Sequence, residues 1–281
     1  MCTIGCVFNH GEILTFKQCD LTAKTEFLEP EVATGSAGRY LAFRRVGRPG
    51  IWAGVNERGV SFVAADYYTN EDPGSVAAPQ TRFSLTSTHV GESSPVDALF
   101  RAYEAAISEH TTAASAIAFL KKWYLTQGDP GAPQPNFKSP DIVLMADSTQ
   151  AIFLEYYPGD TPGTAQVLTL SPKEGWFAST NHARMFSQTV DYSKNHSTYL
   201  RLARAEALLG KQPNLDGIRS VLQDQYYGET ELSICRIAAQ PGQYFTQASV
   251  ITQVSSGGIS ADYLVNGNPR TKPFRKKVLR P

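Results

Sequence analysis

Short runs of β-branched and aromatic residues recur along the chain, separated by turns that contain Gly, Asn or Ser. Each run has the length of a strand, and the connections are too short for a parallel crossover. The pattern therefore predicts antiparallel hairpins, the first of which closes at His10-Gly11. The expected strand pairs are 2–9 with 12–20, 51–55 with 60–65, 141–147 with 151–156, 165–170 with 175–180, and 244–253 with 261–265.

Apolar residues at three- and four-residue spacing predict two pairs of helices between these hairpins. The first pair covers about 95–109 and 113–124, and the second covers 198–209 and about 215–225. Gly210 stands where a left-handed C-terminal cap is expected. Hairpins interrupted by paired helices indicate an α+β protein in which stacked antiparallel sheets are covered by helices.

The chain of 281 residues shows no internal repeat and no clean boundary, so 1–281 is expected to form a single domain. The Gly- and Pro-rich stretches 70–80 and 127–140 are predicted long loops. Six Lys or Arg side chains crowd into about 270–281, which predicts a solvated, partly disordered basic C-terminal tail.

Composition narrows the class of partner. The chain is 42% hydrophobic and 19% charged, as in ordinary globular proteins, and Lys+Arg and Asp+Glu are both 26. The balance gives no electrostatic reason to expect nucleic acid or an anionic membrane surface as a partner. No apolar run reaches the roughly 18 residues of a membrane span, and the N-terminus lacks the features of a secretory signal. A cytoplasmic location is therefore expected.

The four cysteines are Cys2, Cys6, Cys19 and Cys235, and their spacing shows neither a CxxC motif nor a disulfide scaffold. No cluster of histidines accompanies them, so no metal is expected. Cys2 differs from the others because removal of Met1 by methionine aminopeptidase would give it a free α-amine. The reference pKa of an α-amine is about 7.7–8.0, so it is partly neutral near physiological pH and can take the proton of the thiol.

A two-residue loop at His10-Gly11 places Cys2 opposite Cys19 and Ile4 opposite Lys17. Lys17 is then diagonal to Cys2 on the same face of the hairpin, where its charge favours the thiolate. Asp20, at the end of the partner strand, is expected to reach and orient the terminal amine.

The opening Met1-Cys2-Thr3, followed by a basic residue at Lys17 and an acid at Asp20, resembles the choloylglycine hydrolase and penicillin V acylase group. It also resembles the related acyl-CoA:6-aminopenicillanic acid acyltransferases, within the N-terminal-nucleophile hydrolase superfamily. Later segments fit in the same order, and the last three are closer to the acyltransferases. These segments are Gly54–Gly59, Ser179–His182, Ser197–Arg204, Ser233–Arg236, Ala248–Ile251 and Val265–Pro269.

The resemblance implies a four-layer αββα fold and an enzyme that cleaves linear, non-peptide amides through an acyl-thioester on Cys2. The implied catalytic residues are Cys2, Lys17, Asp20, Asn56, Asn181 and Arg201. Asn56 and Asn181 are expected to hold the oxyanion. Arg201 is expected to support the nucleophile, with Arg204 as the alternative match. The expected partner is a small N-acyl amide or acyl donor. No cofactor is implied, and a homo-oligomer is plausible.

Three alternatives stay open. An acyltransferase of the same fold would pass the acyl group from Cys2 to an amine. An inactive binding homologue is the second alternative, because the family usually has arginine at Lys17, and lysine lacks the planar fork of donors. The third is a Cys–His pair formed by Cys2 and His182. Tyr67, Tyr68 and Trp176 are candidates for lining an acyl pocket.

Overall fold

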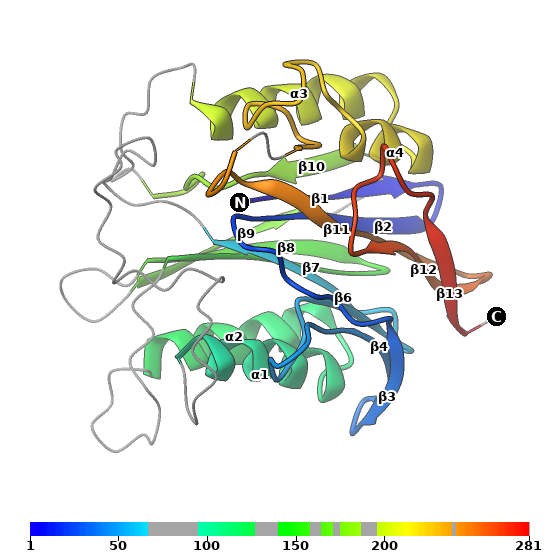
Figure 1. Cartoon of the computed structure of the whole chain (residues 1–281). Coiled ribbons are helices and arrows are strands. Elements are labelled where there is room, and N and C mark those ends of the chain that lie inside the picture. The colour runs from blue at the N-terminus through cyan, green and yellow to red at the C-terminus, as the bar shows by residue number, and fades with distance from the viewer. Residues whose placement is uncertain are drawn as a thin grey trace.

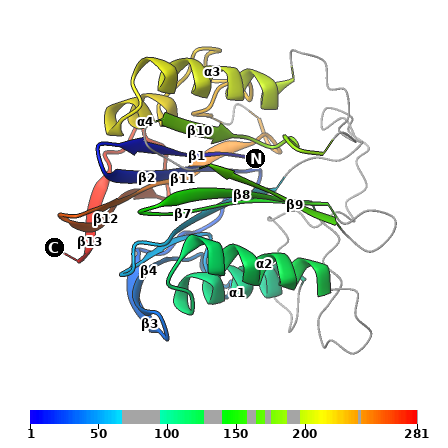
Figure 2. The same cartoon turned by 180° about the vertical axis from the view of Figure 1, so that it is seen from behind.

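The computed structural model describes residues 1–66, 95–126, 140–157, 164–170, 175–186, 196–237 and 240–280. Two antiparallel sheets pack face to face, and each is covered on its outer side by two helices (Figures 1 and 2). In Figure 1, α3 (Ser197–Lys211) and α4 (Leu215–Leu222) lie above the upper sheet, and α1 (Pro95–Ser108) and α2 (Ala113–Thr126) lie below the lower one. The predicted four-layer αββα fold is confirmed.

The upper sheet carries the N-terminus and has six strands in the order β10-β1-β2-β11-β12-β13. The β1–β2 hairpin closes at His10 and Gly11, whose φ angles of 49° and 81° are those of the predicted two-residue turn. The strands are β1 (Cys2–Asn9), β2 (Glu12–Leu21), β10 (Gly175–Ser179), β11 (Phe245–Ser255), β12 (Gly258–Val265) and β13 (Arg275–Arg280).

The lower sheet has seven strands, and their order in the sheet follows their order in the chain. The edge strand β3 is largely exposed, whereas the central strands β6 and β7 are buried on both faces. The strands are β3 (Glu31–Gly35), β4 (Gly38–Phe43), β5 (Ala53–Asn56), β6 (Ser61–Asp66), β7 (Asp141–Asp147), β8 (Gln150–Tyr157) and β9 (Thr164–Leu170).

Strands β1 and β2 are buried on both faces, and alternation along each strand decides which layer a side chain meets. Cys2, Ile4 and Cys19 belong to the core between the two sheets, whereas Leu14 and Phe16 pack with the helices above. By this alternation, Lys17 shares the inter-sheet face with Cys2 and Cys19. The Asp20 side chain points to the helix side.

One predicted hairpin is wrong. Residues 165–170 and 175–180 do form strands, but β9 pairs with β8 in the lower sheet and β10 pairs with β1 in the upper one. The two strands therefore belong to different sheets. Neighbouring strands in the sequence do not pair here, and β10 instead pairs with β1, which is distant from it in the sequence.

The C-terminus and the second helix pair also differ from expectation. The basic tail is not disordered over Arg275–Arg280, which forms the edge strand β13 beside β12. Gly210 does not cap its helix, because α3 continues to Lys211 and is followed by Gln212 with φ −146°. The loop predicted at 70–80, and the one at 127–140 except for its last residue, lie outside the described residues. Within the described part of the chain, no helix has both the length and the apolar character needed to cross a membrane.

Candidate active site

Cys2 lies at the start of β1, opposite Cys19 on β2, and Ile4 lies opposite Lys17, as the turn predicted. The side chain of Cys2 is only 1% exposed and that of Cys19 is 4% exposed. Each of the two thiols shifts the pKa of the other, that of Cys2 downward and that of Cys19 upward. The hairpin therefore sets two thiols against each other, with the cation of Lys17 on the same face.

The main chain of Cys2 is held by two side chains from outside the hairpin. Its N–H donates to Asn181 Oδ1 at 2.8 Å, and its carbonyl accepts from Arg201 Nη1 at 2.6 Å. Arg201 Nη2 also donates to Asn181 Oδ1 at 2.8 Å. Cys2, Asn181 and Arg201 thus form a closed, buried triangle, and the nitrogen at one corner becomes the α-amine when Met1 is removed.

Arg201 is placed for this role by α3. It is fully buried, and it also donates to Thr3 Oγ1 at 3.1 Å, to Ser197 Oγ at 3.2 Å and to the Met1 sulfur at 3.6 Å. Arg204, one turn later, instead pairs with Asp224 at 2.7 Å. The structure therefore brings Arg201, and not Arg204, to Cys2.

The orientation of the Asn181 amide is fixed by its neighbours. Its Oδ1 accepts from two donors, and its Nδ2 donates to the backbone carbonyl of Asp66 at 2.6 Å. Reversing the amide would set N–H against N–H, so oxygen must face Cys2. An amide nitrogen carries two protons, and the described hydrogen bonds use one of them.

The sulfur of Cys2 is acidic for a buried thiol. The Cys19 thiol, Lys17 and the N-terminal ammonium lower the pKa of Cys2 from 9.0 to about 6, against the opposing effects of burial and Asp66. Lys17 is 3% exposed, and its Nζ donates to the Trp52 carbonyl at 3.3 Å. No carboxylate among the described residues forms an ion pair with Lys17, so its charge favours the Cys2 thiolate.

This acidity predicts selective labelling. In folded protein, alkylation of Cys2 by iodoacetamide should rise as the pH passes through about 6, because the thiolate is the nucleophile. Cys235 is the internal control, because burial raises its pKa to about 12. Peptide mass spectrometry after a short pulse at each pH gives both curves. Coinciding curves for Cys2 and Cys235 would contradict the predicted acidity.

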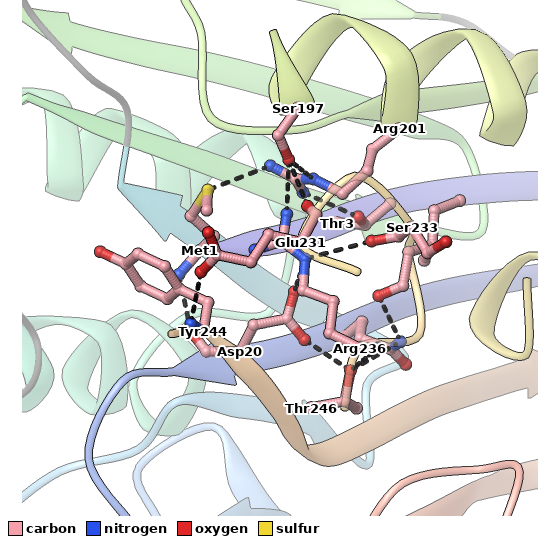
Figure 3. Close-up of polar contacts among 12 residues, drawn as sticks. Met1, Thr3, Asp20, Ser197, Arg201, Glu231, Ser233, Arg236, Tyr244 and Thr246 are labelled. Atoms are coloured by element: carbon pink, nitrogen blue, oxygen red, sulfur yellow. Dashed lines mark hydrogen bonds and ion pairs between the residues drawn. The ribbon is translucent and has the colours of Figure 1, made fainter. Parts of the chain in front are cut away.

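The Asp20 carboxylate lies on the helix side of β2, as the alternation requires. Its Oδ1 accepts from Thr246 Oγ1 at 2.8 Å, and its Oδ2 lies 3.5 Å from Arg236 Nε. Asp20 meets the N-terminus through its backbone, whose carbonyl accepts from the Met1 amine at 2.6 Å. The link between Asp20 and the terminus is thus made by the main chain (Figure 3).

Sequence reasoning missed a pair of residues that connect these parts. Ser197 Oγ accepts from Arg201 Nε at 3.2 Å and from Arg236 Nη2 at 2.7 Å, and it donates to the Glu231 carbonyl at 2.6 Å. Arg236 then meets Asp20 (Figure 3). Both residues lie in segments that carried the resemblance, but only the folded chain shows that one hydroxyl joins two buried guanidinium groups.

Asn56 is not brought to Cys2, which corrects the expectation that it holds the oxyanion. Both protons of its amide are used, by the carbonyls of Ile107 and His110 at 2.8 Å each. Its Oδ1 accepts from the backbone N–H groups of Arg58 and Val60 at 3.1 Å and 3.0 Å. Asn56 therefore fixes the β5–β6 turn against the end of α1.

The position of that turn supports the same correction. A Cβ on Gly59 would meet Val254, and Val254 pairs with Ile13 near the turn of the first hairpin. Cys2 pairs with Cys19 at the other end of the hairpin. Ile13 and Cys19 are six positions apart along the strand, a length of about 20 Å.

His182 does not form the alternative pair with Cys2. Its Nδ1 is hydrogen-bonded to Thr198 Oγ1 at 2.9 Å and Thr180 Oγ1 at 3.2 Å. Burial, with Arg184 and Arg201 nearby, lowers the pKa of His182 to about 3, so the imidazole is neutral.

Of the aromatic candidates for an acyl pocket, Trp176 packs on the helix side of the upper sheet, close to Gly210. That is the face opposite the Cys2 side chain. Tyr67 and Tyr68 lie outside the described residues.

A second feature that the sequence did not reveal is a carboxylate pair at the ends of β6 and β7. Asp66 and Asp141 are directly opposite each other in the ladder. The hydroxyls of Tyr103 and Tyr124 both donate to Asp141 Oδ2. Burial raises the pKa of Asp141 to about 7, although the two hydroxyls act in the opposite direction. Asp66, whose carbonyl binds Asn181, thus has a neighbouring carboxyl that keeps its proton up to near neutral pH.

The raised pKa of Asp141 predicts a pH dependence of stability. The folded state binds this proton more tightly than the unfolded chain does. The stabilisation is therefore complete below about pH 4 and is lost as the pH rises through about 7. The Asp141→Asn variant keeps an acceptor oxygen but cannot ionise. Its free energy of unfolding, measured by urea titration, should fall less than that of the wild type across this range. Parallel pH curves would contradict the raised pKa.

The chain matches no family model, and no curated protein matches its sequence. Among solved structures, an N-acylethanolamine-hydrolyzing acid amidase ortholog from Caenorhabditis elegans superposes with a TM-score of 0.53 and 12% identity, with 99% of each chain covered. An arginine-to-leucine variant of conjugated bile acid hydrolase from Clostridium perfringens gives a TM-score of 0.49 and 10% identity, over 100% of this chain and 97% of that one. The first likeness shows that this chain shares the fold of that amidase.

Proposed function

We propose that the chain is an N-terminal cysteine amidohydrolase that cleaves linear N-acyl amines through an acyl-thioester on Cys2 after removal of Met1. The observation that carries the proposal is the contact between Cys2 N and Asn181 Oδ1 at 2.8 Å. It gives the future α-amine a buried acceptor next to an acidic thiol. One residue then supplies the nucleophile and the base.

The first step transfers the thiol proton of Cys2 to its own α-amine, directly or through water. In the neutral amine, one N–H donates to Asn181 Oδ1, which turns the nitrogen lone pair away from Asn181. The thiolate adds to the acyl carbon, and the resulting ammonium gives its proton to the leaving amine. Water then attacks the thioester, with the α-amine again as base, and releases the acid.

The developing oxyanion needs preorganised donors. The second Nδ2 proton of Asn181 supplies one, which keeps the predicted role for this residue. Lys17 stabilises negative charge on the sulfur from the inter-sheet face. Arg201 fixes the Cys2 carbonyl. The described contacts of Asp20 with the N-terminus are made to Met1 and are lost with it, so no step is assigned to Asp20. Asn56 is left out of the site because its amide is fully used elsewhere.

The substrate class follows from the same chemistry and gains support from the shared fold. The Caenorhabditis elegans amidase is named for hydrolysing N-acylethanolamines, which are amides of a small amine. We therefore propose a small N-acyl amine as the substrate of this chain. Nothing in the proposed steps uses a metal or an organic cofactor.

A panel of N-acyl amines with varied acyl chains tests the proposal, with release of acid and amine followed by chromatography. The protein should form acid from at least one member, and Cys235→Ser should match the wild type, because Cys235 lies outside the triangle. Adding a second amine separates the alternative on the same fold, because an acyltransferase would give the new amide at the expense of acid. Failure to release either product across the panel would contradict the proposal.

A further inference from the structure

We propose that Cys2 and Cys19 form an oxidation site, in which a peroxide converts the two thiols into a reversible disulfide that removes the nucleophile. The two residues are directly opposite each other across the hairpin, their side chains share the inter-sheet face, and both are buried. Cys19 has no assigned role in the proposed amide chemistry beyond its effect on the pKa of Cys2.

The hydrogen bonds around the pair determine its spacing. Met1 and Asp20 exchange both of their backbone hydrogen bonds, at 2.6 Å and 2.8 Å. Opposite residues in an antiparallel ladder alternate between hydrogen-bonded and non-hydrogen-bonded pairs. Cys2 and Cys19 are therefore a non-hydrogen-bonded pair, whose Cα atoms lie about 4.5 Å apart. That spacing falls within the roughly 4.4–6.8 Å that disulfides span.

Both strands are fixed in place, so the bond needs little backbone movement. Cys2 is held by Asn181 and Arg201, and Cys19 lies in a central strand, where it also faces Ala248 of β11. The other cysteines lack this arrangement. Cys6 faces Thr15 across the same hairpin, and Cys235 lies outside the sheet.

The chemistry balances with a hydroperoxide as the oxidant. The Cys2 thiolate attacks the peroxide, breaks the O–O bond and becomes a sulfenic acid, and hydroxide takes a proton and leaves as water. The Cys19 sulfur then attacks the Cys2 sulfur, a second water leaves, and the disulfide forms. Two thiols and one hydrogen peroxide thus give one disulfide and two waters.

The electrostatics assign a different part to each cysteine. Cys2 is the attacking thiolate, because Cys19 and Lys17 lower its pKa. Cys19 keeps its proton, because the neighbouring Cys2 and burial raise its pKa. An acidic sulfur next to a protonated thiol is the arrangement of a sensor cysteine and its resolving partner. The disulfide would protect Cys2 from irreversible oxidation, and a dithiol would restore it.

The test uses protein whose loss of Met1 has been confirmed by mass. Wild type and Cys19→Ser are treated with hydrogen peroxide, and intact mass and iodoacetamide labelling of Cys2 are followed before and after dithiothreitol. Wild type should lose the mass of two hydrogens, and dithiothreitol should restore labelling. Cys19→Ser should gain oxygen atoms and progress to a sulfinic acid that dithiothreitol does not reverse.

Cys6→Ser is the matched control, since it changes a buried cysteine of the same strand and should behave like wild type. The proposal is overturned if wild type gains oxygen without losing two hydrogens, or if Cys19→Ser recovers as completely as wild type. The oxidation proposal rests on the proposed function only in assuming that a small molecule can reach the sulfur of Cys2. The readout is covalent, so a disulfide formed in protein that cleaves no amide would contradict the proposed function alone.

Discussion

Replacing Cys2 by serine is expected to lower amide turnover by at least about a thousandfold, because loss of a catalytic nucleophile costs this much or more. Serine is small enough for Met1 to be removed and keeps the α-amine. However, its hydroxyl is far less acidic than a thiol with a pKa of about 6. The variant therefore measures the contribution of the sulfur atom separately from that of the α-amine. Initial rates on the best substrate of the panel give the measurement.

The control for this loss is Cys235→Ser, which removes a thiol that hydrogen-bonds Asn268 at 3.9 Å, outside the proposed site. Circular dichroism and thermal melts of both variants show whether either loss reflects unfolding. Turnover by folded Cys2→Ser within tenfold of wild type would mean that another group performs the attack.

The second large effect is expected from Arg201→Met. Methionine fills part of the volume of the arginine side chain, but it leaves the buried carbonyl of Cys2 without its hydrogen-bond donor. Asn181 Oδ1 also loses one of its two hydrogen-bond donors. Each buried polar group left unpaired costs about 1–3 kcal/mol, so the free energy of unfolding should fall by about 3 kcal/mol. The rate should fall by about a hundredfold or more, because the α-amine is no longer held in one orientation.

Arg204→Met is the matched control, one turn along the same helix. Its ion pair with Asp224 is partly exposed, so stability should change by about 1 kcal/mol or less and the rate should stay near wild type. Urea titration and initial rates on both variants make the comparison. Equal losses at the two positions would show that α3 acts as a general support and that Arg201 has no special place at Cys2.

The sequence predicted the part of the site that local geometry controls. A two-residue turn at His10-Gly11 fixes the register of its hairpin, and this alone places Cys2 opposite Cys19 and Lys17 on the same face. Stacked antiparallel sheets covered by helices were also accessible, because hairpins and paired helices alternate along the chain. The four-layer arrangement itself was an implication of the family resemblance. The edge strand β3 was missed because its residues are mostly exposed and lack a buried face to reveal it.

The rest of the site depends on contacts between distant segments. A short motif cannot show whether the side chain of an asparagine binds substrate or stabilises its own turn. The Asn56 side chain accepts from its own turn and donates to a carbonyl at the end of α1. The Arg236 and Ser197 contact needs the 231–236 segment to fold back over α3. Asp66 was overlooked because its backbone carbonyl, and not its side chain, binds Asn181.

Trapping the acyl-enzyme tests the central claim most directly. Protein mixed with a reactive N-acyl substrate is quenched in acid, digested and mapped by mass spectrometry. The acyl group should sit on the sulfur of an N-terminal peptide that begins with Cys2. Active protein in which Met1 remains attached, or an acyl group found on any other residue, would contradict the account.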